Sequence, residues 1–358
     1  MKLKTFPTQT KSHTEKEMFF DDGVDVARYD VVKYPVFSRL SKEQFGFTWG
    51  PEEISLAADV VNFRKFDAAK EHIFTANLKR QILLDSIQGR GPLEALLPIC
   101  SLPELENWFI RWSASEVVHS ETYVYMIRAL YTNPSYVFDN LRSIPEIEEC
   151  AASITPYYDN LIHFDGEYGS KAHRKALWMC LNAINALEAV RFYVSFACTY
   201  AFGKAGLLTG CADEIRLINQ DEDLHRKGTT EMIKHLLKEN PIYTEIRDEC
   251  EEEVTQMFVD VIEQECAWAD YLFKEGSMLG LTAPLLKEYV RWVGTKRMRG
   301  VGLKSPYKIS QHNPLPWVDE YVNEANSQKS PQEEGLTSYE KGRVVQDFDT
   351  SNFADFSL

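Results

Sequence analysis

Apolar residues recur every three or four positions along most of the chain, which is the spacing of one face of an α-helix. Strand-type alternation of apolar and polar residues is scarce. The sequence therefore predicts an all-α fold, with helices over residues 67–88, 103–131, 145–162, 171–202, 211–239, 243–274 and 282–300. Turn-forming segments separate these helices, among them GRGP at 89–92, TNPS at 132–135, DGEYGS at 165–170, GKAG at 203–206 and ENP at 239–241.

Changes in this pattern along the chain predict three parts. Residues 1–50 are expected to be irregular and to pack on the helical domain. That domain, residues 51–322, is expected to begin with a helix in WGPEEISLAADVVNFRKF, where Pro51 suits the first helical position. Residues 323–358 are polar and carry no helical stripe, so they are predicted to form a flexible C-terminal tail.

Two core stripes contain polar residues where only apolar ones are expected. Around SASEVVHSETYVY, residues 113–125, one helical face consists of Trp112, Glu116, His119, Tyr123, Ile127 and Leu130. In NQDEDLHRKG, residues 219–228, Glu222 and His225 repeat the Glu-x-x-His spacing on a similar stripe. Two further helices each place one acid, Asp85 or Glu188, on an apolar stripe. Buried carboxylates and imidazoles must be paired, hydrogen-bonded or bound to something.

The evidence for a metal site is the occurrence of all these acids and histidines on core stripes, and not the Glu-x-x-His motif itself. With 54 acids and 8 histidines in 358 residues, an acid-x-x-His spacing is expected about once by chance. A single such pair more often lies on a solvent-exposed helix face, or contains a core histidine whose hydrogen bonds are made within the protein. Four acids and two histidines on core stripes are different, because four carboxylates cannot all stay ionised in a bundle core without cations. The pattern predicts a carboxylate-bridged dimetal site in a ferritin-like bundle, with donors suited to iron or manganese.

Composition limits the remaining possibilities. The net charge of −15 argues against nucleic-acid binding and against attachment to an anionic membrane surface. The seven cysteines show no C-x-x-C pairing, so neither a zinc knuckle nor a disulfide framework is indicated, and a cytoplasmic location is expected. The N-terminal residues lack an apolar run, so no signal peptide is expected, and no segment approaches the length that spans a bilayer.

Several segments resemble the small, radical-generating subunit of class Ia ribonucleotide reductase, from about residue 20 to the last residue. They are LLDSIQGRGP, SEVVHSETY, NALEAVRFYVSFAC, DEDLH, KEGSMLGL and NPLPW. The resemblance implies two iron ions per chain, with manganese as an alternative, and O₂ as the oxidant. It implies that one iron is held by Asp85, Glu116 and His119. It implies that the other is held by Glu188, Glu222 and His225.

The same resemblance gives roles to residues outside the ligand set. Tyr123 would carry a stable tyrosyl radical, in a pocket lined by Phe192, Phe196 and Ile218. Without the resemblance, all four would be taken as ordinary core residues. Electron transfer would then use Trp49, Asp221 and the tail residue Tyr339. The chain departs from the family pattern in a short loop at 163–172, in Gln220 where arginine is common, and in Glu121.

The implied function is one half of an enzyme. This subunit would form a homodimer, generate the radical and pass it to a separate large subunit, bound through the C-terminal tail, that reduces ribonucleotides. Two alternatives stay open from the residues alone. One is another dimetal oxidase, oxygenase or ferroxidase on the same bundle, and the other is a helical scaffold whose polar residues pair with each other.

Overall fold

The computed structural model of the chain describes residues 11–278 and 280–322. Within these residues the fold is helical, and the only β-type pairings are isolated bridges. Three helices are much longer than the others: α5 (Pro103–Leu130), α11 (Thr209–Glu239) and α12 (Ile242–Leu272). The other main helices are α1 (Pro35–Gly46), α2 (Ala57–Phe63), α3 (Ala68–Gln88), α4 (Gly91–Leu96), α9 (Lys171–Ala186), α10 (Tyr193–Lys204) and α13 (Ala283–Gly300). The all-α prediction is confirmed.

Short elements complete the described part of the chain. They are α6 (Ser135–Asp139), α7 (Pro145–Ala152), α8 (Thr155–Ile162), α14 (Asp319–Val322) and several single turns of 3₁₀-helix, including η1 (Pro51–Glu53). Among the described residues, no helix combines the length and the apolar composition that a bilayer span requires.

Local sequence explains where the main helices begin. The side chains of Asp67, Ser170 and Thr282 accept hydrogen bonds from the first-turn amides of α3, α9 and α13. Such caps satisfy amide groups that have no partner within the helix. Prolines stand in the first turn of α1, α5 and α7, where the missing amide proton costs nothing.

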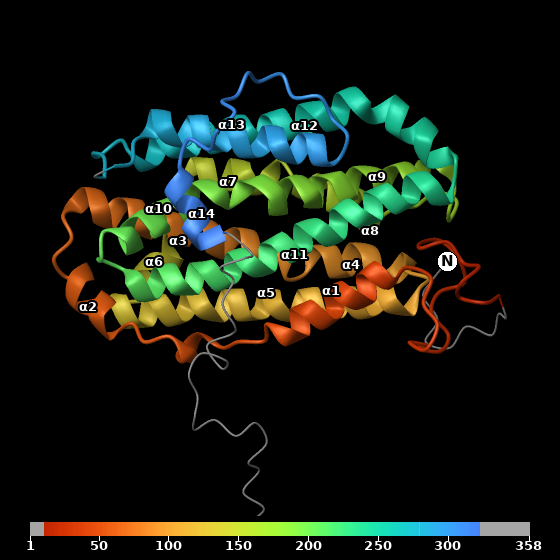
Figure 1. The fold of residues 1–358 in the computed structure, drawn as a ribbon, viewed down its shortest axis with the longest axis horizontal. Coiled ribbons are helices and arrows are strands. Elements are labelled where there is room, and N and C mark those ends of the chain that lie inside the picture. Colours follow the sequence, from red (N-terminus) through yellow and green to blue (C-terminus); the bar gives the residue numbers. More distant parts are fainter. Residues whose placement is uncertain (1–10, 279, 323–358) are drawn as a thin grey trace, which may run out of the picture.

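The helices pack so that α3, α5, α9, α10 and α11 surround a common core (Figure 1). Helices α12 and α13 lie together along one side of the bundle, and α1 packs on α5 and α11 near the opposite side. Trp108, Trp112 and Trp268 are among the largest side chains that are fully buried. Burial of this apolar surface is the main force that holds the helices together.

The N-terminal region differs from the prediction that residues 1–50 are irregular. Residues Pro35–Gly46 form α1, which packs against α5. Its buried face consists of Phe37, Leu40, Ser41 and Gln44, at helical spacing. Two of these four residues are polar, so the apolar helical pattern is difficult to recognise in the sequence of this segment. The helix expected at Pro51 is also shorter than predicted, because residues 51–53 form only a 3₁₀ turn and α2 starts at Ala57.

Two predicted helices are interrupted. Residues 145–162 divide into α7 and α8, because the ring of Pro156 would clash with the carbonyl four residues earlier in a continuous helix. The helix predicted over residues 171–202 contains a π-helical turn, η4 (Leu187–Arg191), between α9 and α10. This turn carries Glu188, one of the predicted metal ligands.

Candidate metal centre

The six predicted ligands converge in the core as two overlapping groups. Asp85, Glu116, His119 and Glu222 place one ligand atom each within 4.8 Å of one another, and so do Glu116, Glu188, Glu222 and His225. All six side chains are fully buried. They come from α3, α5, η4 and α11, so four separate segments build the site. Glu116 and Glu222 belong to both groups, so each of them could help to hold either of two metal ions.

Both imidazoles turn Nδ1 toward the carboxylates. His119 Nδ1 lies 3.4 Å from Glu116 Oε2 and 3.3 Å from Glu222 Oε1. His225 Nδ1 lies 3.1 Å from an oxygen of each of the same two glutamates. The i, i+3 spacing on α5 and α11 produces this arrangement, because such residues project from one helix face. Nδ1 is therefore the nitrogen that each histidine would offer to a metal.

The other ring nitrogen of each histidine faces a different hydrogen-bond partner. His119 Nε2 lies 3.0 Å from Asp221 Oδ2, and His225 Nε2 lies 3.0 Å from Ser115 Oγ. Because a carboxylate oxygen accepts hydrogen bonds, Nε2 of His119 is the ring nitrogen that donates to Asp221, and Nδ1 is left facing the other carboxylates. Outer partners of this kind fix the tautomer and ring orientation of metal-binding histidines.

Sequence reasoning missed some residues that hold the carboxylates in place. Trp112 Nε1 donates to Glu116 Oε1 over 3.0 Å, although only the core position of Trp112 was expected. Gln88 Nε2 donates to Glu188 Oε1, and Gln88 in turn accepts from the hydroxyl of Tyr158. Gln88 lies three residues after Asp85, so its helical spacing was a usable signal. Ser115, which contacts His225, precedes Glu116 directly in the chain, and its position in the sequence did not indicate this contact.

The residues present fit a dimetal group. Buried polar atoms normally have partners, yet five atoms that face the centre have none: Asp85 Oδ1, Glu116 Oε2, His119 Nδ1, Glu188 Oε2 and Glu222 Oε1. Burial raises the pKa of Asp85 and of Glu188 well above the ordinary carboxyl range, and neighbouring glutamates raise both further. Positive metal ions would remove this repulsion. A set of carboxylates and imidazoles suits iron or manganese better than metals that prefer thiolates.

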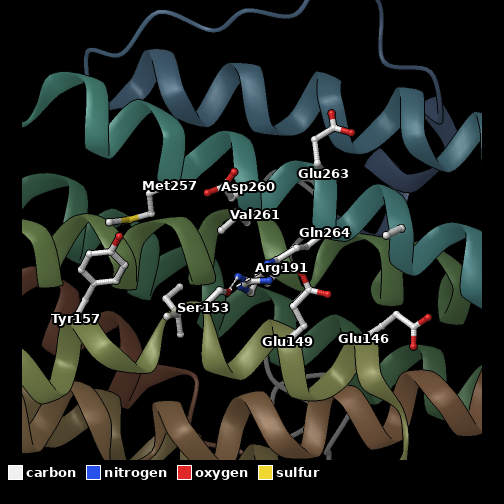
Figure 2. A pocket seen from close by; sticks show the side chains of 12 residues that line it. Glu146, Glu149, Ser153, Tyr157, Arg191, Met257, Asp260, Val261, Glu263 and Gln264 are labelled. Atoms are coloured by element: carbon white, nitrogen blue, oxygen red, sulfur yellow. Dashed lines mark hydrogen bonds between the residues drawn. The ribbon is translucent and has the colours of Figure 1, made fainter.

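The π-turn that presents Glu188 is anchored from outside the site. Arg191 Nη2 donates to Ser153 Oγ on the α7–α8 connection over 2.7 Å, and Arg191 Nη1 lies 3.1 Å from Cys150 Sγ. Arg191 and Ser153 both line a cavity of about 440 Å³ that is bordered by residues of α7 and α12. Figure 2 shows these two side chains directed toward each other. Single π-turns inside helices are uncommon and recur at functional sites, where they re-aim side chains.

Tyr123 lies directly beside the carboxylate cluster. Its hydroxyl donates to Asp85 Oδ2 over 2.7 Å, and the side chain is fully buried. Burial raises the pKa of Tyr123 well above its ordinary value, and the adjacent Asp85 carboxylate adds to this effect, so the phenol stays protonated. Phe192, Phe196 and Ile218, the predicted lining of its pocket, are all buried in the same core.

The predicted electron-transfer residues form a connected chain as far as the structure describes them. Asp221 Oδ2 accepts from Trp49 Nε1 over 3.1 Å and also faces His119 Nε2. The rings of Trp49 and His119 lie 6.3 Å apart. Glu121 is exposed, as expected for a residue off the stripe. Tyr339 lies outside the described residues.

Comparison with known proteins identifies the family. The sequence model for the ribonucleotide reductase small chain matches residues 27–314. The chain belongs to this family. It is 42% identical over 378 residues to the ribonucleoside-diphosphate reductase 1 subunit beta of Escherichia coli O157:H7, and 41% identical over 377 residues to the subunit beta of Haemophilus influenzae. Each alignment covers 100% of both proteins.

Solved structures of ribonucleotide reductase small chains share the fold. The R2 subunit from Clostridium botulinum aligns with a TM-score of 0.81 at 22% identity, over 90% of this chain and 98% of that one. A dimanganese(II) protein from Streptococcus sanguinis aligns with a TM-score of 0.72 at 18% identity, over 84% of this chain and 99% of that one. The ferritin-like bundle predicted from the sequence is confirmed. Family membership also contradicts the interpretation of the chain as a non-enzymatic scaffold.

Proposed function

We propose that this chain is the small subunit of a ribonucleoside-diphosphate reductase, which generates a tyrosyl radical on Tyr123 and relays it to a large catalytic subunit. The observation that carries the proposal is the 2.7 Å hydrogen bond from the Tyr123 hydroxyl to Asp85, at the edge of two overlapping ligand groups. Full-length similarity to relatives named subunit beta of this reductase supports it. The large subunit would bind and reduce the ribonucleotide.

For the metal, we propose two iron ions per chain, with O₂ as the oxidant. One ion would be held by Asp85, Glu116 and His119, and the other by Glu188, Glu222 and His225. The mixture of carboxylate oxygens and imidazole nitrogens supports iron and equally allows manganese. When bound, the metal ions supply the O₂ chemistry that removes an electron from the tyrosine.

The side chains around Tyr123 then determine the fate of the proton and of the radical. Loss of an electron from a buried phenol is accompanied by loss of its proton, and Asp85 Oδ2 is hydrogen-bonded to that proton. Phe192, Phe196 and Ile218 offer no hydrogen-bonding groups on their side chains. An apolar surrounding of this kind excludes water and small reductants, which would lengthen the lifetime of the radical.

Relay to the large subunit would use the chain of contacts that leads away from the metal centre. It runs from His119 through Asp221 to Trp49, in the segment that follows α1, and the hydrogen bonds between these side chains support this path. We propose that Tyr339 continues the relay and that the tail, residues 323–358, binds the large subunit. We also propose a homodimer. Exposed apolar side chains on one face of α5, Ile110 and Val117, support an interface.

Metal content tests the assignment of the ligands. After loading with iron, the wild-type chain should retain about two ions. Glu222→Ala should retain markedly fewer, because Glu222 lies in both ligand groups. Glu121→Ala, an exposed carboxylate on the same helix as Glu116, is the control and should match wild type. A Glu222→Ala protein with two irons and an unchanged optical spectrum would show that the ligands are wrong. Two irons in the wild type without any tyrosyl signal would favour a different dimetal oxidase.

A further inference from the structure

Gln44 makes a direct contact with the proposed relay that the sequence did not indicate. It lies on the inner face of α1 and is buried, with 5% of its surface exposed. Its Nε2 donates to Asp221 Oδ1 over 2.7 Å, while its Oε1 has no hydrogen-bond partner. Since Asp221 can only accept when ionised, the amide nitrogen is the atom that must face it. The hydrogen bonding of this side chain is therefore directed entirely at Asp221.

With this contact, both oxygens of the Asp221 carboxylate have a hydrogen-bond partner. Gln44 occupies Oδ1, while Trp49 and His119 share Oδ2. Donors on both oxygens hold the carboxylate in one plane, so that Oδ2 stays aimed at the indole and the imidazole at once. With Oδ1 unoccupied, the carboxylate could turn away from either ring, since nothing else in the described contacts of Asp221 restrains that oxygen.

A small cavity beside this contact makes the role of Gln44 more specific. It has a volume of about 130 Å³, and Gln44, Trp49 and Asp221 all contribute to its wall. The cavity is large enough for water, and Gln44, Arg111 and Asp221 place polar groups in a wall that is otherwise largely apolar. If Gln44 were replaced by an apolar side chain, water from this cavity would compete for Asp221 and for the indole N–H. Gln44 would thus keep this water away from Oδ1 of Asp221 as well as orient the carboxylate.

We propose that Gln44 is a positioning residue for electron transfer between Trp49 and the metal centre, acting through Asp221. This inference rests on the proposed function of the chain, because it assigns Gln44 a role in the same relay. Transfer along such a chain depends on geometry, and misplacement of reacting groups by about 1 Å can reduce a rate by on the order of 10²-fold.

Ser41 provides a matched control on the same helix. It lies one turn before Gln44, is equally buried, and faces the same side of α1. Its hydroxyl donates to the carbonyl of Phe37 within α1 and makes no contact with the relay. Ser41→Ala therefore reports what a small disturbance of α1 does by itself.

The test compares Gln44→Met, Gln44→Glu and Ser41→Ala with wild type. Methionine keeps the shape of glutamine without its donor, and glutamate adds a negative charge beside Asp221. In the metal-free protein, the indole N–H resonance of Trp49, assigned with Trp49→Phe, should shift in both Gln44 variants and not in Ser41→Ala. In the iron-loaded protein with saturating large subunit, kcat should fall about tenfold or more in both Gln44 variants, with metal content and apparent partner affinity unchanged.

Two outcomes would overturn the inference. One is an indole resonance and a kcat in Gln44→Met that both match wild type while the tyrosyl signal is normal. The other is an equal loss of kcat in Ser41→Ala, which would attribute the effect to α1 as a whole. Failure of the proposed function is distinguishable, because it would appear as an iron-loaded wild type without a tyrosyl radical, whatever residue stands at 44.

Discussion

Glu214 on α11 is an isolated acid in the core. It is fully buried, and neither carboxylate oxygen has a hydrogen-bond partner. Burial raises its pKa from 4.5 to about 9, and Asp213, Glu52 and Glu53 add smaller contributions in the same direction. At neutral pH the folded chain therefore keeps a proton on Glu214 that the unfolded chain releases.

Because Glu214 is protonated only in the folded chain, the free energy of unfolding should depend on pH. Because the folded-state pKa is raised, the contribution of Glu214 to the free energy of unfolding falls as pH rises from about 4.5 to about 9, by about 1.4 kcal/mol per pH unit at most. Glu214→Gln, which stays neutral, should remove this part of the slope. Urea unfolding of the metal-free protein at pH 6, 7 and 8 measures it. Glu251→Gln, on an exposed position of α12, is the control. Parallel slopes for wild type and Glu214→Gln would contradict the assignment.

Single residues also mark the limit of prediction from the sequence. The ligands could be placed on core stripes because helical spacing relates residues within one helix, as with Glu116 and His119. The partners of those ligands could not, since Ser115 meets His225 and Gln44 meets Asp221 across helix interfaces. Such contacts depend on how the helices are rotated against each other, and the apolar pattern of a single helix does not specify that rotation.

Close packing of α5 and α11 brings the two Glu-x-x-His motifs together, and Gly228 on α11 allows it. A Cβ at this position would meet Trp108 Nε1 at 2.5 Å. Trp108 is fully buried, and its ring lies 6.2 Å from that of His225, so it has little freedom to move. The glycine therefore sets how near α11 lies to α5.

Substitution of Gly228 tests this packing. Alanine favours helix over glycine by about 1 kcal/mol, yet overpacking a rigid core typically costs about 1–3 kcal/mol. We expect the clash to dominate, so that Gly228→Ala lowers the free energy of unfolding in urea and reduces metal retention. Gly300→Ala, at a helical glycine with open space around it, should be neutral or slightly stabilising. A Gly228→Ala protein as stable as Gly300→Ala would show that α11 can move without cost.

Element boundaries were predictable where the sequence contains caps and breakers. The ends of α3, α5, α11 and α13 agree with the predictions to within about two residues. The π-turn at Leu187–Arg191 was not predictable, because its sequence, LEAVR, is compatible with an ordinary α-helix. Tertiary contacts favour the π-turn, because Arg191 donates a hydrogen bond to Ser153 and Glu188 faces the candidate metal centre.

At the scale of the whole molecule, the chain is one half of an assembly. Residues 345–358 include Phe348, Phe353, Phe356 and Leu358 in an otherwise polar and acidic segment. Spaced apolar side chains of this kind suit binding in a groove of a partner. We predict that removal of residues 345–358 abolishes binding to the large subunit but leaves the metals and the radical intact.

Tyr339→Phe should have the opposite effect. Assembly should be retained and turnover lost, because only a phenol can relay both an electron and a proton. Affinity for the large subunit, measured by sedimentation, and the EPR signal of the same samples distinguish the two variants. Native affinity after truncation, or normal turnover of Tyr339→Phe, would exclude the tail from the mechanism.

The most direct test of a tyrosyl radical on Tyr123 is the EPR spectrum of iron-loaded Tyr123→Phe beside that of wild type. Phenylalanine fits the same apolar surroundings and removes only the hydroxyl that bonds to Asp85. Both proteins should hold about two irons per chain, wild type should show a tyrosyl signal, and Tyr123→Phe should show none and have no reductase activity. A tyrosyl signal of the same shape and yield in Tyr123→Phe would contradict the assignment of the radical to Tyr123.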